Sequence, residues 1–89
     1  MIHIVKRKGH KQKFDERKLY AAVYSACLSA HVPKEEAEVT SNLVTREVKK
    51  WVDEKKEVTS DAIFKKAGEE LEHLNKDASL MYTTHRDIS

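Results

Sequence analysis

The 89-residue sequence has few of the residues that break or cross-link a chain: two glycines, one proline and one cysteine. A lone cysteine, Cys27, excludes an internal disulfide and a cysteine-rich zinc site, and it leads us to expect the reducing cytoplasm. No apolar run is long enough for a membrane span, and none resembles a secretory signal. The scarcity of glycine and proline, with 39% hydrophobic residues, is typical of a small helical domain rather than a disordered chain.

Charge is abundant but nearly balanced, with 36% charged residues and a net charge of +2. Its distribution along the chain is uneven. Residues 1–18 carry seven cations and two anions, whereas the rest of the chain carries ten cations and thirteen anions. The basic N-terminal end is therefore the part of the sequence that points to an anionic ligand, although the overall balance argues against a general nucleic-acid binder.

The apolar pattern predicts one α+β domain, mostly α, over residues 1–89. We expect a β-hairpin over 2–14, because β-branched and alternating residues flank a turn at Gly9. Val58 is placed to extend this hairpin into a short three-stranded sheet. Beneath the hairpin we expect a four-helix bundle. The approximate bounds of its helices are 15–31, 34–54, 60–74 and 78–87.

Residues with capping chemistry mark the ends of these helices. Asp15 is a favoured N-cap for the first helix, and Val32–Pro33 ends it, because the residue before proline avoids the helical conformation. Either Thr59 or Ser60 is expected to cap the third helix, and residues 75–77 interrupt the helical pattern before the fourth.

The apolar faces of the helices predict the core. Val39 and Leu43 are expected to widen the valine-rich face of the second helix, and Leu74 to complete that of the third. Cys27 lies on the apolar face of the first helix and is expected to be a buried small hydrophobe. For Trp51 we expect core packing; an exposed Trp51 would instead indicate a partner surface.

Cations converge where the expected hairpin leads into the first helix. Lys6 and Arg7 lie at the end of a strand, and Lys18 lies on the first helical turn. A helix N-terminus exposes unpaired N–H groups, and cations from neighbouring elements suit a polyphosphate better than a single carboxylate. A solvated basic hairpin remains the alternative interpretation of this segment.

Three motifs carry a resemblance to a known family. Val-Lys-Arg-Lys-Gly at 5–9, followed by Phe-Asp-Glu-Arg-Lys-Leu at 14–19, resembles the opening of the ATP-cone domain. This domain is the nucleotide-sensing module of ribonucleotide reductases and of their transcriptional repressor. Glu-Val-Thr-Ser-Asp-Ala-Ile at 57–63 is similar to the segment that opens the family's third helix. The resemblance extends over about residues 3–87.

The resemblance implies a helical bundle capped by a short sheet, with ATP or dATP bound between the two. Carried over position by position, it implies that the phosphates contact Lys6, Arg7 and Lys18. It places Gln12, Asp15 and Leu19 around the base and sugar, and Ile4 and Ser60 along the pocket wall.

We therefore expect a non-catalytic regulatory module that binds an adenine nucleotide, ATP or dATP, with or without Mg²⁺. Such a module signals through its conformation, through self-association or through a regulated protein partner. We expect no enzymatic or metal site, because the sequence has no Walker-type loop and its five histidines show no ligand spacing. The alternative function is a small nucleic-acid-binding protein whose basic hairpin lies along the phosphates. The near-neutral net charge and the lack of aromatic residues beside the cations argue against it.

Overall fold

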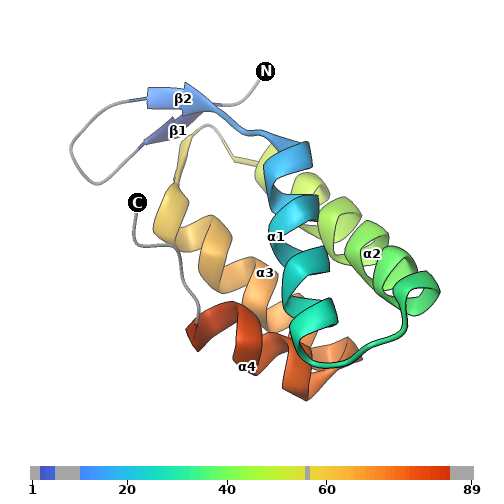
Figure 1. The fold of residues 1–89 in the computed structure, drawn as a ribbon. Coiled ribbons are helices and arrows are strands. Elements are labelled where there is room, and N and C mark those ends of the chain that lie inside the picture. The colour runs from blue at the N-terminus through green and yellow to red at the C-terminus, as the bar shows by residue number, and fades with distance from the viewer. Residues whose placement is uncertain (1–2, 6–10, 56, 85–89) are drawn as a thin grey trace.

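A computed structural model describes residues 3–5, 11–55 and 57–84 of the chain. Within these residues the mostly helical fold is confirmed, with four helices and short strands gathered at one end of them (Figure 1). The strands are β1 (His3–Val5), β2 (Lys11–Lys13) and β3 (Glu57–Thr59). The helices are α1 (Glu16–Ser29), α2 (Lys34–Asp53), α3 (Ser60–Leu74) and α4 (Lys76–Thr84). None of these helices has the length and hydrophobicity needed to span a membrane.

The strands pair in the order β2-β1-β3. β1 runs antiparallel to β2, and Ile4 lies opposite Gln12; β1 runs parallel to β3, and Ile4 lies opposite Val58. The parallel pair needs a long crossover, which α1 and α2 supply. Residues 6–10, with the expected turn at Gly9, lie outside the described residues, so the hairpin as a whole stays a prediction.

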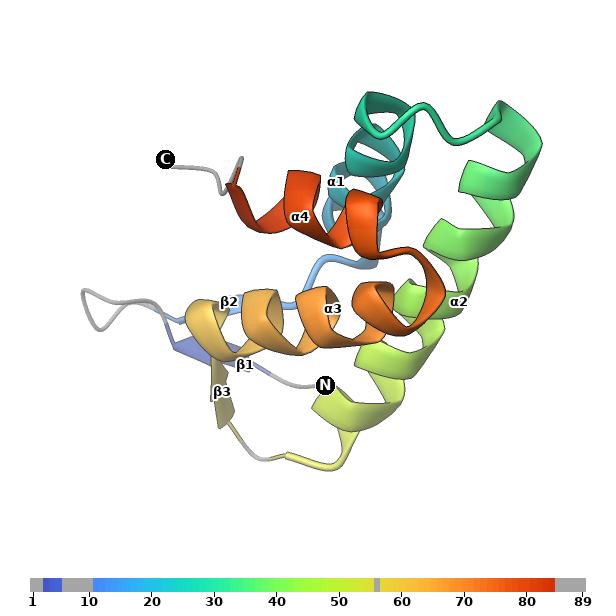
Figure 2. The same ribbon diagram turned by 90° about the horizontal axis from the view of Figure 1, so that it is seen from below.

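The helices pack as a bundle in which α1 contacts α2 and α4, while α3 contacts the same two helices (Figures 1 and 2). Their shared core is rich in β-branched and small residues, as the apolar pattern predicts. The largest of its fully buried side chains belong to Leu71, Val23, Val44, Val48 and Val52. Cys27 is also fully buried, which confirms that it serves as a small core hydrophobe.

Three of the expected core residues are instead exposed. Val39 and Leu43 retain 58% and 42% of their exposure, because α2 buries the face around Val44 and these two residues flank that face. Leu74 retains 49%, because it is the last residue of α3 and extends beyond the helices that cover the rest of that face.

Side-chain caps set the starts of α3 and α4. Thr59 is the cap of α3, since its Oγ1 accepts a hydrogen bond from the Ala62 amide at 3.0 Å. Asn75 caps the N-terminus of α4, since its Oδ1 accepts a hydrogen bond from the Ala78 amide at 2.9 Å. Because of this cap, α4 begins at residue 76, two residues earlier than expected. The expected end of that helix lies outside the described residues.

The turn between α1 and α2 ends α1 before the proline is reached. The His31 amide donates to the Leu28 carbonyl and the Val32 amide donates to the Cys27 carbonyl, both at 3.0 Å. This is the Schellman arrangement, and it requires a left-handed residue, which is His31 with a φ of 65°. Pro33 then precedes the first residue of α2 and supplies no side-chain cap.

Candidate site at the junction of sheet and helices

The parallel pairing of β1 and β3 brings two predicted site segments together. Val5 lies opposite Thr59, so the carboxyl ends of the two strands are neighbours. The chain continues from Val5 into Lys6 and from Thr59 directly into Ser60, the first residue of α3. In α/β proteins, anions bind where parallel strands end and a helix begins. The side chains of Lys6 and Arg7 lie outside the described residues.

The N-terminus of α1 differs from the expectation in one respect. The Asp15 carboxylate accepts from the backbone amides of Arg17 at 3.0 Å and Lys18 at 3.3 Å, both through Oδ1. The expectation of unpaired N–H groups here was wrong for these two amides, because the N-cap itself satisfies them. The negative carboxylate also offsets the positive end of the helix dipole. At this end of the site, an anion would therefore meet the exposed Lys18 side chain rather than these amides.

The remaining predicted site residues lie along the sheet and the first turn of α1. Ile4 and Gln12 are register partners, and Ile4 also pairs with the buried Val58. Leu19 is 7% exposed and belongs to the core, so it can serve only as a wall. β2 ends at Lys13, opposite His3 at the start of β1, so α1 begins near that end of β1. Ser60 follows Thr59, which lies opposite Val5 at the other end of β1. The length of this three-residue strand separates the two positions by about 7 Å.

An ion-pair network beside the site was not foreseen from the sequence. Lys49 Nζ on α2 lies 3.0 Å from Asp53 Oδ2 and 3.9 Å from Glu16 Oε1 on the first turn of α1. The hydrogen bond to Asp53 raises the pKa of Lys49 above its usual value. Four-residue spacing is a signal for the Lys49–Asp53 pair, but no sequence signal links Glu16 to a residue 33 positions away.

An aromatic pair joins the first turns of α3 to α4. The rings of Phe64 and Tyr82 are stacked, with centroids 4.8 Å apart and an interplanar angle of 21°. Tyr82 is buried, and burial raises the pKa of its hydroxyl to about 12. This contact therefore holds a neutral tyrosine between the two helices near the end of α3 that bears Ser60.

Trp51 lies at the C-terminal end of α2 and is half-buried against the core, as expected. The ammonium groups of Lys55 and Lys66 lie 5.2 Å and 6.0 Å from the centre of its indole ring. Among residues 3–5, 11–55 and 57–84, no three His, Cys, Asp or Glu side chains are grouped closely enough to hold a metal ion.

Comparison with protein-family models finds a match to the ATP cone domain over residues 2–88, essentially the whole chain. No curated protein matches the chain in sequence. ATP-cone domains are regulatory domains that bind ATP or dATP as an effector and do not themselves catalyse a reaction. The match agrees with the opening motifs at 5–9 and 14–19 and with the segment at 57–63. The chain belongs to the ATP-cone family.

Proposed function

We propose that this chain binds the triphosphate of ATP or dATP across the junction of the sheet with α1 and α3, and that binding regulates the protein without chemistry on the nucleotide. The observation that carries the proposal is the parallel register of Val5 with Thr59. It brings the start of α3 beside the end of β1, and Lys6 and Arg7 come next in the sequence. A helix N-terminus together with cations from a neighbouring element suits a triphosphate.

In this proposal Lys6, Arg7 and Lys18 contact the phosphates. Arginine binds phosphate with two parallel hydrogen bonds, and the two lysines add point charges from different elements. The Ser60 hydroxyl, exposed at the first turn of α3, lies along the pocket wall with Ile4.

The nucleoside lies towards α1 in this proposal, around Gln12, Asp15 and Leu19. Both amide bonds of Asp15 end on Oδ1, so Oδ2 can accept from an adenine amino group or a ribose hydroxyl while the cap remains intact. Leu19 contributes an apolar wall from the core. Asp15 therefore serves both as helix cap and as ligand contact.

A nucleotide in this position touches α1 and α3, and each of these two helices packs against both α2 and α4. Its nucleoside end lies at α1, which Glu16 links to Lys49 on α2, and its phosphate end lies at α3, which Phe64 links to Tyr82 on α4. A ligand that favours one relative placement of α1 and α3 therefore shifts the bundle towards that state, with or without Mg²⁺. The shift is read out as a change in conformation or in association.

Thermal melting of the full chain with ATP, dATP and GTP, each with and without Mg²⁺, tests the proposal. Ligand at a hundredfold its Kd adds about 2.7 kcal/mol to the free energy of unfolding. For a domain of this size, the midpoint should rise by roughly 10 °C or more with ATP or dATP. Unchanged melting curves with every nucleotide at millimolar concentration would falsify the proposal.

Variants of the cations separate a phosphate site from general charge. Lys6→Ala with Arg7→Ala should abolish the shift, and Lys18→Ala should weaken binding by roughly ten- to hundredfold, since each charge-assisted contact contributes about 1.5–3 kcal/mol. Arg46→Ala removes an exposed cation from the middle of α2 and should leave binding unchanged. Equal weakening by Arg46→Ala, or loss of binding at moderate salt, would point to nonspecific attraction of a polyanion.

A further inference from the structure

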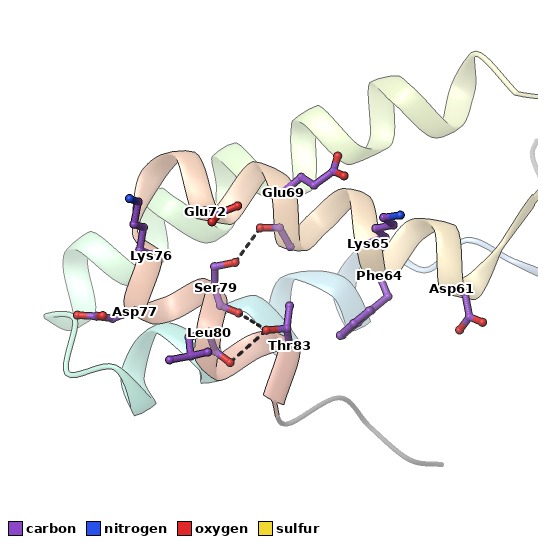
Figure 3. A pocket seen from close by; sticks show the side chains of 11 residues that line it. Asp61, Phe64, Lys65, Glu69, Glu72, Lys76, Asp77, Ser79, Leu80 and Thr83 are labelled. Carbon is purple, nitrogen blue, oxygen red and sulfur yellow. Dashed lines mark hydrogen bonds between the residues drawn. The ribbon is translucent and has the colours of Figure 1, made fainter.

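A groove of about 720 Å³ runs between α3 and α4 (Figure 3). Its floor is narrow because the two helices approach closely at Gly68, whose carbonyl accepts a hydrogen bond from Ser79 Oγ at 2.9 Å. A Cβ at position 68 would lie 3.2 Å from Thr83 Cγ2. The contact of Gly68 with Ser79 thus joins the two helices at the floor of the groove. Phe64 and Leu80 provide apolar surface along the groove.

The rim of this groove is acidic. Four carboxylates line it against two lysines, namely Asp61, Glu69, Glu72 and Asp77 against Lys65 and Lys76. This excess of negative charge disfavours a phosphate-bearing ligand. Leu80 lines the groove and is 58% exposed, so its side chain is accessible to a partner.

We propose that the α3–α4 groove docks a basic amphipathic helix of a partner protein. A third helix laid between two packed helices places an apolar anchor against Leu80 and Phe64, and its lysines or arginines then meet the acidic rim. Charge complementarity selects the partner, and the apolar anchor supplies most of the affinity. The inference does not depend on nucleotide binding.

The charges of the helices also indicate whether the groove binds a partner protein or a second copy of this chain. Of the described helices, α1 has the most positive balance, with two cations against one anion, while α2 and α3 have more anions than cations. None of the described helices is therefore a strongly basic amphipathic helix that could fill the groove of another copy. Self-association through the groove is an outcome that the test must exclude.

The test uses two fluorescein-labelled peptides of the same length and helical pattern, one of leucine and lysine and the other of leucine and glutamate. Anisotropy titrations with the full chain should show binding of the lysine peptide and no binding of the glutamate peptide. Absence of binding by the lysine peptide at low salt overturns the proposal, as does equal binding of both peptides.

Matched variants locate the binding site. Glu69→Gln with Glu72→Gln removes two charges from the rim, and Glu35→Gln with Glu38→Gln removes two at the same spacing from α2. The rim variant should weaken binding of the lysine peptide by roughly three- to tenfold, since exposed ion pairs contribute modestly. Equal weakening by the α2 variant means that only net charge matters, and it overturns the proposal.

The apolar anchor is tested separately. Leu80→Ala should weaken binding of the lysine peptide by about tenfold or more, whereas Val39→Ala on α2 should not, although both side chains are 58% exposed. Circular dichroism and melting confirm that the variants fold. Sedimentation of the chain without peptide completes the test: self-association that Leu80→Ala abolishes identifies a second copy as the occupant and overturns the proposal.

Discussion

Val5 and Thr59 lie opposite each other in the parallel register of β1 and β3, although 54 positions separate them in the chain. Each is the last residue of its strand. The segments after the two strands therefore begin at the same edge of the sheet: Lys6 and Arg7 after β1, and the N-terminus of α3 after β3. This pairing is the reason why the proposed site joins Ser60, at the start of α3, with the basic residues that follow β1 in the sequence.

Ser60→Glu tests this arrangement directly. The new carboxylate would stand at the first position of α3, where the helix dipole favours it, so the fold should be preserved or slightly stabilised. Beside a bound triphosphate it repels the phosphates, and ATP affinity measured by calorimetry should fall by roughly tenfold or more. Ser60→Ala, which adds no charge, should lower the affinity by only a small factor. Unchanged affinity of the S60E variant would place the phosphates away from α3.

Asp15 variants distinguish its two proposed roles. Asp15→Ala removes the acceptor of the Arg17 and Lys18 amides and should lower the free energy of unfolding by about 1 kcal/mol in urea titrations. Asp15→Asn retains an acceptor of equal capping strength, so stability should be nearly that of the wild type. If Asp15 also accepts from the nucleoside, both variants should bind ATP more weakly. Full ATP affinity in Asp15→Asn would limit Asp15 to its capping role.

Two hydroxyls buried on α2 should reduce the stability of the protein. Ser41 Oγ and Thr45 Oγ1 are buried without a hydrogen-bond partner among the residues that the structure describes. A buried unsatisfied hydroxyl costs on the order of 1 kcal/mol or more. Ser41→Ala and the isosteric Thr45→Val should therefore each raise the free energy of unfolding by about 1 kcal/mol.

Alanine also favours helices, and a control must account for that. Ser25→Ala makes the same exchange at an exposed position of α1. Ser41→Ala should stabilise the protein by more than Ser25→Ala does. Equal effects of the two substitutions would show that the buried hydroxyl carries no penalty.

Stability should fall in alkaline solution because of Tyr82. Its pKa is about 12 in the folded protein, against 10 for an ordinary tyrosine, so the unfolded chain loses the proton first. Tyr82 therefore leaves the free energy of unfolding unchanged below pH 10, and lowers it by about 2 kcal/mol as the pH rises from 10 to 12. Urea titrations across this range should show a smaller decline for Tyr82→Phe than for the wild type. Parallel declines would indicate that Tyr82 ionises normally in the folded state.

The local features of this protein follow from short stretches of sequence. The apolar spacing of α1 to α3 predicts helices, and Asp15 and Thr59 carry the chemistry of N-caps at positions where the structure has them. These features depend on residues within a few positions of one another. The opening motif at 5–9 and the segment at 57–63 likewise identify the family from consecutive residues.

The tertiary structure decides which distant residues become neighbours. Only the register of β1 with β3 brings Thr59 to Val5, and only the packing of α1 on α2 brings Lys49 to Glu16. Exposure depends on the same packing: Leu74 has the spacing of a core residue, but it lies at the end of α3, where the neighbouring helices leave it half exposed. The α3–α4 groove is also a product of packing, because its depth depends on how closely two helices approach at Gly68. Periodicity specifies which side of a helix is apolar, whereas contacts between distant elements depend on how all the helices and strands pack together.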